Sequence, residues 1–158
     1  MFSIGLLLAG CDDAQAVIDD LFHKGTQIGV VRCIERNKKT GIAEDVIVAR
    51  CREHHQKPIP RAVEGNARYW DVGAFEIEVR NASSNHVVTR VDVNLRHVDN
   101  PAGSEVLQFQ NLWLEPGVTQ KQAVPLGFKP QADRLSHDDG KTWDWELREV
   151  YGVDIALR

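Results

Sequence analysis

Between residues 75 and 96 the chain alternates apolar and polar side chains, and this period of two constrains its fold more than any other feature. Apolar residues recur at every second position of 75–79 and, with Thr89 as the exception, of 87–95, mostly with charged residues between them. Successive side chains of a β-strand point to opposite faces, so the pattern predicts two half-buried antiparallel strands with one face in a core. Val87, Thr89 and Val91 are expected to share that buried face.

Turn-forming residues divide the rest of this region into further strands. Clusters of Asn, Asp, Ser, Pro and Gly predict turns, and apolar runs predict strands between them. The predicted turns are 81–85, 99–103 and Glu115-Pro116-Gly117, and the further strands are 106–114, 119–126 and 143–147. Short strands separated by regular turns predict an antiparallel β-sandwich over residues 61–158.

The chain before residue 61 has helical periodicity instead. Apolar residues three and four positions apart predict a short amphipathic helix over 12–22. Gly25 and Gly29 are expected to interrupt that pattern, and the pattern of 30–34 does not decide between helix and strand.

A second helix is expected after a turn at residues 38–41. Thr40, with Glu44 four residues later, is a loose N-cap signal, and the helix runs through about His54. Pro58 and Pro60 are expected to end it and to form a linker. A helical segment at 11–60 therefore precedes the β-sandwich.

The first ten residues carry no charge and end abruptly at Cys11-Asp12-Asp13. Ten apolar residues cannot cross a bilayer as a helix, which takes about 20. The length is typical of the apolar region of a secretory signal peptide, and small residues before Cys11 are typical of a cleavage site.

Leu8-Ala9-Gly10-Cys11 resembles the lipobox of bacterial prolipoproteins. The resemblance implies that residues 1–10 are removed, that Cys11 carries lipid, and that this lipid attaches the protein to a membrane. In proteobacterial lipoproteins an acidic pair after the cysteine marks retention in the inner membrane, so Asp12 and Asp13 imply the periplasmic face of that membrane. More than one acyl chain makes such anchoring stable.

The cysteine count fits this interpretation. Assigning Cys11 to lipid leaves Cys33 and Cys51 as an even pair, which is expected to form a disulfide in an oxidising periplasm. The alternatives are two reduced cysteines in a cytosolic domain or a metal-binding pair.

A metal or haem carrier that uses Cys51, His54 and His55 is a weaker hypothesis. These residues lie three and four positions apart on one predicted helix face, but a closed site needs about four ligands, and no second cluster supplies them. Histidines at a helix C-terminus also complement its dipole. We therefore expect neither a metal nor a cofactor.

The order of signals in the β-region resembles a bacterial immunoglobulin-like module of the FxLYD kind. The resemblance covers about residues 66–157 and implies an immunoglobulin-like β-sandwich, with a binding or spacing role at the cell envelope and no catalytic residues. The matching segments are 75–79, Asn81-Ala82-Ser83, Val91-Asp92-Val93, 99–103 and Leu114-Glu115-Pro116-Gly117.

A sharper local motif follows at residues 136–143. Its specified positions, Ser136, Asp138, Gly140, Thr142 and Trp143, match the Asp-box pattern. Asp-boxes recur in sialidases and other β-propellers, which carry several copies over several hundred residues. One copy in 158 residues predicts a structural hairpin and excludes a sialidase.

Composition narrows the function further. The net charge is −4, and no basic run is longer than Lys38-Lys39, so nucleic acid is not expected as a partner. The chain has no phosphate loop, HExxH or GxSxG motif, so we do not expect an enzyme.

The sequence therefore predicts a membrane-anchored periplasmic lipoprotein that is a non-enzymatic binding or accessory subunit, with an unidentified protein partner. The alternative is a carbohydrate-binding module or small glycan-active protein that uses exposed aromatic residues. The candidates for that surface are Tyr69, Trp70, Trp113, Trp143 and Trp145.

Overall fold

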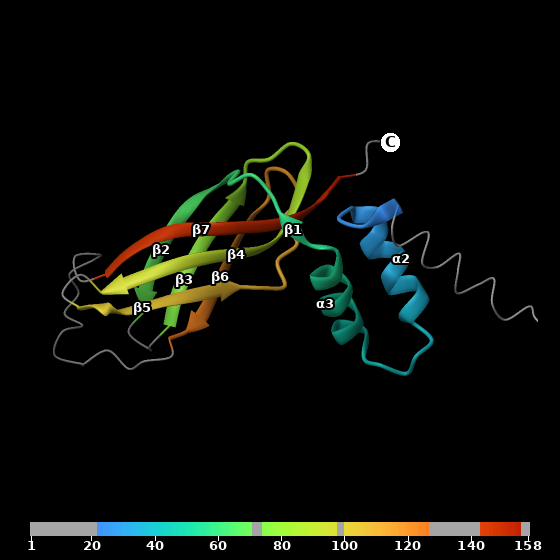
Figure 1. The fold of residues 1–158 in the computed structure, drawn as a ribbon, viewed down its shortest axis with the longest axis horizontal. Coiled ribbons are helices and arrows are strands. Elements are labelled where there is room, and N and C mark those ends of the chain that lie inside the picture. Colours follow the sequence, from blue (N-terminus) through green and yellow to red (C-terminus); the bar gives the residue numbers. More distant parts are fainter. Residues whose placement is uncertain (1–21, 71–73, 98–99, 127–142, 156–158) are drawn as a thin grey trace, which may run out of the picture.

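The computed structural model describes residues 22–70, 74–97, 100–126 and 143–155, which form two antiparallel β-sheets and two helices (Figure 1). One sheet has the order β1-β7-β4-β5 and the other β2-β3-β6. The elements are α2 (Gln27–Asn37), α3 (Glu44–His55), β1 (Lys57–Pro58), β2 (Val63–Trp70), β3 (Ala74–Asn81), β4 (His86–His97), β5 (Asn100–Phe109), β6 (Thr119–Pro125) and β7 (Trp143–Asp154). The mainly β architecture expected from the alternating pattern is confirmed.

The two sheets share one apolar core, and together they form what we call the β-body. Strand β3 follows the predicted alternation, with Phe75, Ile77 and Val79 buried between polar neighbours. From the other sheet the core receives apolar side chains of β4, β5 and β7, such as Leu95 and Phe109. Burial of these side chains holds the sheets together at about 25 cal/mol for each Å² of apolar surface removed from water.

Strand β4 departs from the predicted alternation at Thr89. Val88 pairs with Gly152 and Arg90 with Tyr151, so Thr89 is an extra residue that shifts the register between β4 and β7. Such a bulge shifts the alternation by one residue, so the side chains before it point to the opposite faces from those that the pattern predicts. Val88 therefore belongs to the core of the β-body, while Val87 lies in a second apolar cluster with helix residues. The expectation that Val87 and Val91 share one face is wrong for this reason.

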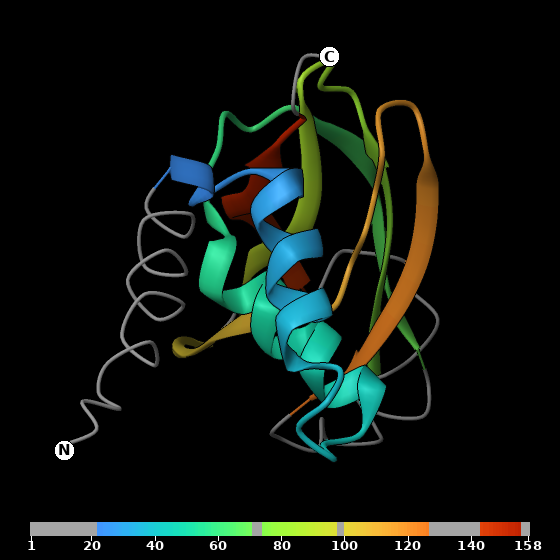
Figure 2. The same ribbon diagram turned by 90° about the vertical axis from the view of Figure 1, so that its right-hand side faces the viewer.

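The helices α2 and α3 form a unit that we call the helix pair, residues 22–55. It packs against one end of the β-body (Figure 2). Cys33 of α2 and Cys51 of α3 form a disulfide, with their Cα atoms 5.7 Å apart, so the predicted pairing is confirmed. The second apolar cluster joins Val30, Ile47 and Cys51 of the helices to two valines of β4 and β7.

Gly29 lies inside α2 and does not interrupt it. Thr26 caps this helix, because its side-chain oxygen accepts a hydrogen bond from the Gly29 amide at 3.1 Å. A side chain at position 29 would place its Cβ 2.2 Å from the His23 carbonyl oxygen and 2.7 Å from the His55 ring, so only glycine allows this close approach of the chain before α2 and of the His55 ring. Residues 30–34, which the sequence left unassigned, are helical.

Helix α3 confirms the second predicted helix, but its start differs from the expected one. Ala43 is the N-cap and makes no side-chain capping bond, while Glu44 and Asp45 place negative charge in the first turn. The Thr40 hydroxyl instead donates to the Asn37 carbonyl at 2.7 Å, in the turn after α2. The predicted cap at Thr40 is therefore wrong.

The expected proline linker is part of the sheet. Lys57 and Pro58 form β1, which pairs with β7, and the Ile59 amide donates to the Val150 carbonyl at 2.9 Å. Proline is tolerated there because β1 is an edge strand. Ile59 is buried in the core, so the helix pair passes directly into the β-body.

Three boundaries in the β-body also differ from the predictions. Strand β5 covers 100–109, so residues 100–103 are strand and not turn, and 110–114 lie beyond the strand. Strand β2 was not predicted, because Gly65 and Asn66 break its apolar pattern. Strand β7 extends to Asp154, well past the predicted 143–147. The predicted turn before β6 is confirmed, because the Val118 amide donates a hydrogen bond to the Glu115 carbonyl at 3.0 Å.

Several predicted features lie outside the described residues. They are the helix at 12–22 apart from its last residue, the lipobox with Cys11, Asp12 and Asp13, and the Asp-box positions 136–142. Trp143 is described only as the first residue of β7. In the described part of the chain, neither helix has the length and hydropathy needed to cross a membrane.

Candidate functional site

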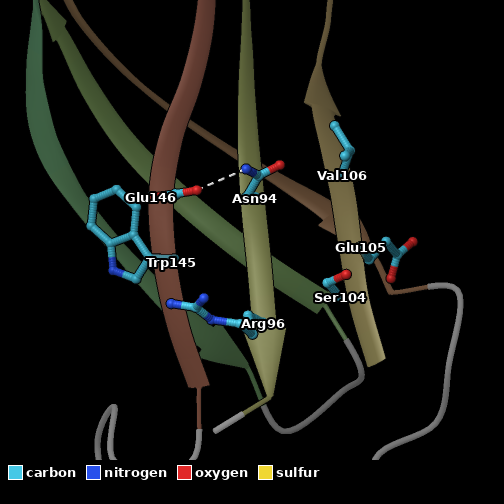
Figure 3. Close-up of a pocket in the computed structure, with 7 residues that line it drawn as sticks. All are labelled: Asn94, Arg96, Ser104, Glu105, Val106, Trp145 and Glu146. Atoms are coloured by element: carbon cyan, nitrogen blue, oxygen red, sulfur yellow. Dashed lines mark hydrogen bonds between the residues drawn. The ribbon is translucent and has the colours of Figure 1, made fainter. Parts of the chain in front are cut away.

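The main candidate site is a groove of about 350 Å³ at the end of the β-body where β4 ends and β5 and β7 begin (Figure 3). We call it the Trp145 groove. Its seven lining residues come from three neighbouring strands: Asn94 and Arg96 from β4, Ser104, Glu105 and Val106 from β5, and Trp145 and Glu146 from β7. Because β4 lies between β7 and β5 in the sheet, strand pairing alone brings these segments together.

Register fixes the positions of the groove residues. Asn94 pairs with Glu146 across β4 and β7, and the Asn94 amide nitrogen donates to the Glu146 carboxylate at 2.9 Å. In Figure 3 the Arg96 side chain extends from β4 toward β7. Trp145 is 40% exposed although its strand partner Leu95 is fully buried, so its indole reaches the rim of the core.

The polar side chains of the Trp145 groove lie on the outer face of the sheet, where Arg96 offers a planar set of donors and Asn94 and Glu146 present an amide and a carboxylate. Trp145 pairs with the buried Leu95, so its exposed indole belongs to the other face, and in Figure 3 it lies on the side of β7 away from β4. The outer-face groups suit a ligand that has several hydroxyl or amide groups, and the indole offers an apolar contact at the edge of β7. The groove is therefore suited to recognition of a polar small molecule or a short oligomer.

The tryptophans differ in their surroundings. Trp145 lines the groove, whereas Trp113 is half-buried beneath Arg52, whose guanidinium carbon lies 4.7 Å from the centre of the indole. Burial lowers the pKa of Arg52. The side chains of Tyr69, Trp70 and Trp143 lie outside the described part of the structure. A surface of several aromatic rings is therefore supported at one described position only, Trp145.

Between the groove and the helix pair, an arginine network covers the outer face of the four-stranded sheet. The Arg90 guanidinium donates to both carboxylate oxygens of Asp92, at 2.7 and 2.6 Å, and stacks 4.3 Å from the centre of the Tyr151 ring. The hydrogen bond to Asp92 raises the pKa of Arg90. Asp92 is almost fully buried, so this bidentate pair is a fixed structural contact.

Tyr151 completes the network, because its hydroxyl donates to Glu149 at 2.5 Å. This hydrogen bond, together with burial, raises the pKa of the Tyr151 phenol. Folding raises this pKa above the unfolded value of about 10, so the contact contributes stability below that pH and loses it as the pH rises through the folded-state pKa.

Replacing Glu149 by Gln is expected to lower the pKa of Tyr151, because the amide accepts the hydrogen bond without repelling the phenolate. Absorbance titration of the phenolate measures this change. A Tyr69→Phe background removes the only other tyrosine of the chain. An unchanged midpoint in Glu149→Gln would show that the Glu149 carboxylate does not control this titration.

A Ser-His-Asp chain that the sequence did not suggest lies at the other end of β4. The Ser83 hydroxyl lies 2.9 Å from His86 Nδ1, and His86 Nε2 lies 3.3 Å from Asp154, which also binds Lys57 at 2.6 Å. Ser83 is buried, and its oxygen accepts the backbone amides of Asn85 and His86. A nucleophilic serine must present its oxygen to a substrate. We therefore assign this chain to stabilising the turn before β4.

The Cys51, His54 and His55 hypothesis does not fit the structure. The Cys51 sulfur is bonded to Cys33 and cannot act as a thiolate ligand. The rings of His54 and His55 meet edge to face, with centres 5.0 Å apart. Within the described ranges, no three His, Cys, Asp or Glu side chains gather in a way that could hold a metal ion.

Comparison of the chain with known protein families, with curated proteins and with solved structures found no match.

Proposed function

We propose that this protein is a lipid-anchored binding or accessory subunit on the periplasmic face of the bacterial inner membrane. The anchor is Cys11, and Asp12 and Asp13 are its sorting signal. The β-body then extends from the membrane as a non-enzymatic domain. Its protein partner belongs to an envelope complex.

The Cys33–Cys51 disulfide is the observation that carries this proposal. Disulfides persist in oxidising compartments and are rare in the cytosol. The bond accounts for two of the three cysteines and leaves Cys11, the residue at the lipobox position, as the third. Cysteine chemistry and the N-terminal motif thus support the same compartment independently of each other.

Mass spectrometry of the protein extracted from membranes tests the anchor. We expect the loss of residues 1–10 and a mass increase on Cys11 equal to a diacylglyceryl group plus an acyl chain. Cys11→Ser is expected to abolish both changes and to leave residues 1–10 attached. An unmodified Cys11 in the native protein, with the original N-terminus intact, would refute the anchor.

Strand order supports the further proposal that the β-body is an immunoglobulin-like sandwich. In one sheet, β2, β3 and β6 occupy the positions of strands A, B and E of that fold. In the other sheet, β7, β4 and β5 occupy the positions of strands F, C and C′. Strand β1 lies beside β7, where strand G lies in an immunoglobulin domain. An experimental structure that gives β7 a neighbour other than β4 and β1 would contradict this assignment.

A second candidate function is glycan binding, and the exposure of Trp145 favours it. A sugar ring offers an apolar face for the indole and hydroxyl groups for Arg96, whose side chain extends toward β7, the strand of Trp145 (Figure 3). This function is compatible with the first, because a tethered subunit at the cell envelope faces glycans directly.

Replacing Trp145 by Ala is expected to weaken binding of any captured oligosaccharide by roughly 30-fold, the effect typical of a central aromatic anchor. The measurement is a screen of an array of neutral and acidic oligosaccharides, followed by titration of the strongest binder. Trp113→Ala is the matched control, since Trp113 lies under Arg52 and outside the groove. Capture that is equal in the two variants would exclude the groove as the site.

A further inference from the structure

Most of the large apolar side chains that are exposed in the described residues belong to the helix pair. Of the eight large apolar side chains that are exposed in the described residues, five belong to residues 22–46. They are Phe22, Ile28, Val31, Ile42 and Val46. Their exposed fractions range from 37% at Val46 to 79% at Phe22, so much of this apolar surface meets solvent.

Two of these residues, Ile28 and Val31, share a face of α2 with positive charge. Ile28, Val31 and Arg32 are exposed and lie three and four positions apart, so they project from the same side of the helix. Glu35 also lies on this side, but its carboxylate is 2.6 Å from the Lys38 ammonium. The outer face of α2 is thus apolar, and Arg32, Glu35, Lys38 and Lys39 together give it a net charge of +2.

The whole helix pair is basic, although the protein is acidic. Residues 22–55 contain seven Lys and Arg against four Asp and Glu, a net charge of +3, whereas the complete chain has a net charge of −4. A segment of opposite sign to the rest of the chain orients the molecule in the field of a charged surface.

The position of the helix pair places this surface close to the proposed anchor. Phe22 follows Cys11 by 11 residues, a length of chain that spans at most about 40 Å when fully extended. The helix pair lies at one end of the long axis of the molecule, and the strand ends that form the Trp145 groove lie at the other (Figure 1).

We propose that the outer face of the helix pair docks on an anionic phospholipid bilayer. Exposed apolar side chains enter the interface between headgroups and acyl chains, while Arg32, Lys38 and Lys39 meet the anionic headgroups. This inference deepens the proposed function and rests on its membrane location. It assigns the second contact with the bilayer to the helix pair and directs the Trp145 groove away from the membrane.

Co-sedimentation with vesicles tests this docking without the anchor. The full-length Cys11→Ser protein is mixed with vesicles of phosphatidylcholine alone or of equal parts phosphatidylcholine and phosphatidylglycerol. We expect binding to the anionic vesicles at least tenfold stronger than to the neutral ones, and a loss of this preference at high salt.

Matched substitutions locate the contact. Lys38→Glu is expected to weaken binding to anionic vesicles by roughly tenfold or more, whereas Lys121→Glu, at a similarly exposed and ion-paired lysine of β6, leaves it unchanged. Val31→Ser is expected to weaken binding about fivefold, whereas Val118→Ser, at a similarly exposed valine of the β-body, does not. Circular dichroism confirms that each variant remains folded.

The outcomes separate this inference from the proposed anchor. If Cys11 carries lipid but the Cys11→Ser protein shows no preference for anionic vesicles, or if Lys38→Glu and Lys121→Glu bind equally, docking by the helix pair is wrong and the anchor stands. If Cys11 carries no lipid but the helix-pair variants alone lose binding, docking stands and the anchor is wrong.

Discussion

Removal of the Cys33–Cys51 disulfide is expected to lower the free energy of unfolding by roughly 3 kcal/mol. The bond closes a loop between residues 18 positions apart, and opening that loop gives the unfolded chain conformations that the disulfide forbids. The expected fall in melting temperature is about 10 °C for a domain of this size.

Thermal and chemical denaturation with and without reductant measure this effect. A Cys11→Ser background prevents exchange with the third cysteine. The double variant Cys33→Ala with Cys51→Ala is the control, because it should match the reduced protein and should not respond to reductant. Equal melting temperatures in the oxidised and reduced states would show that the disulfide contributes nothing to the stability of the helix pair.

Asn81→Ala is expected to destabilise the protein by about 3 kcal/mol. The fully buried Asn81 side chain donates to the carbonyls of His86 and Leu114, each at 2.8 Å, and accepts the Ser83 amide at 2.9 Å. Alanine leaves these three backbone groups without their partner, and each buried unpaired group costs roughly 1–3 kcal/mol before the structure relaxes.

Asn66→Ala provides the matched control for this prediction. Asn66 is an exposed residue of β2, and its replacement is expected to change stability by no more than about 0.5 kcal/mol. Denaturant unfolding of both variants gives the comparison. Similar midpoints for the two would show that Asn81 does not hold the turn between β3 and β4 in place.

The sequence predicted the elements whose signals are local. Alternation predicted β3, helical spacing predicted α3, and Glu115-Pro116-Gly117 predicted the turn before β6. Each of these depends on residues close together in the chain, where side-chain period and turn chemistry act directly.

Features that depend on distant segments were missed. The sequence placed Ile59 in a proline linker, but its amide bonds to Val150 of β7, a residue far away in the chain. The bulge at Thr89 arises only from the pairing of β4 with β7. Gly29 was predicted to interrupt a helix, and the structure explains it instead by the close approach of the His23 carbonyl oxygen and the His55 ring. In each case a tertiary contact overrides a correct local tendency.

The Trp145 groove was predicted only in part for the same reason. The alternation at the start of β7 identified Trp145 as an aromatic residue that is either core or surface, and its exposure decides between them. Arg96 and Ser104 gave no signal, because they become neighbours only when β4 pairs with β5. The disulfide was predictable because the inference used only the number of cysteines and did not depend on where the fold places them.

The meeting of the two ends of the described chain has a practical consequence. Thr26, just before α2, bridges Asp154 at the end of β7, and the Asp154 amide donates to the Gly25 carbonyl at 2.8 Å. A reporter protein fused after β7 would therefore emerge beside the helix pair and leave the opposite end of the molecule free.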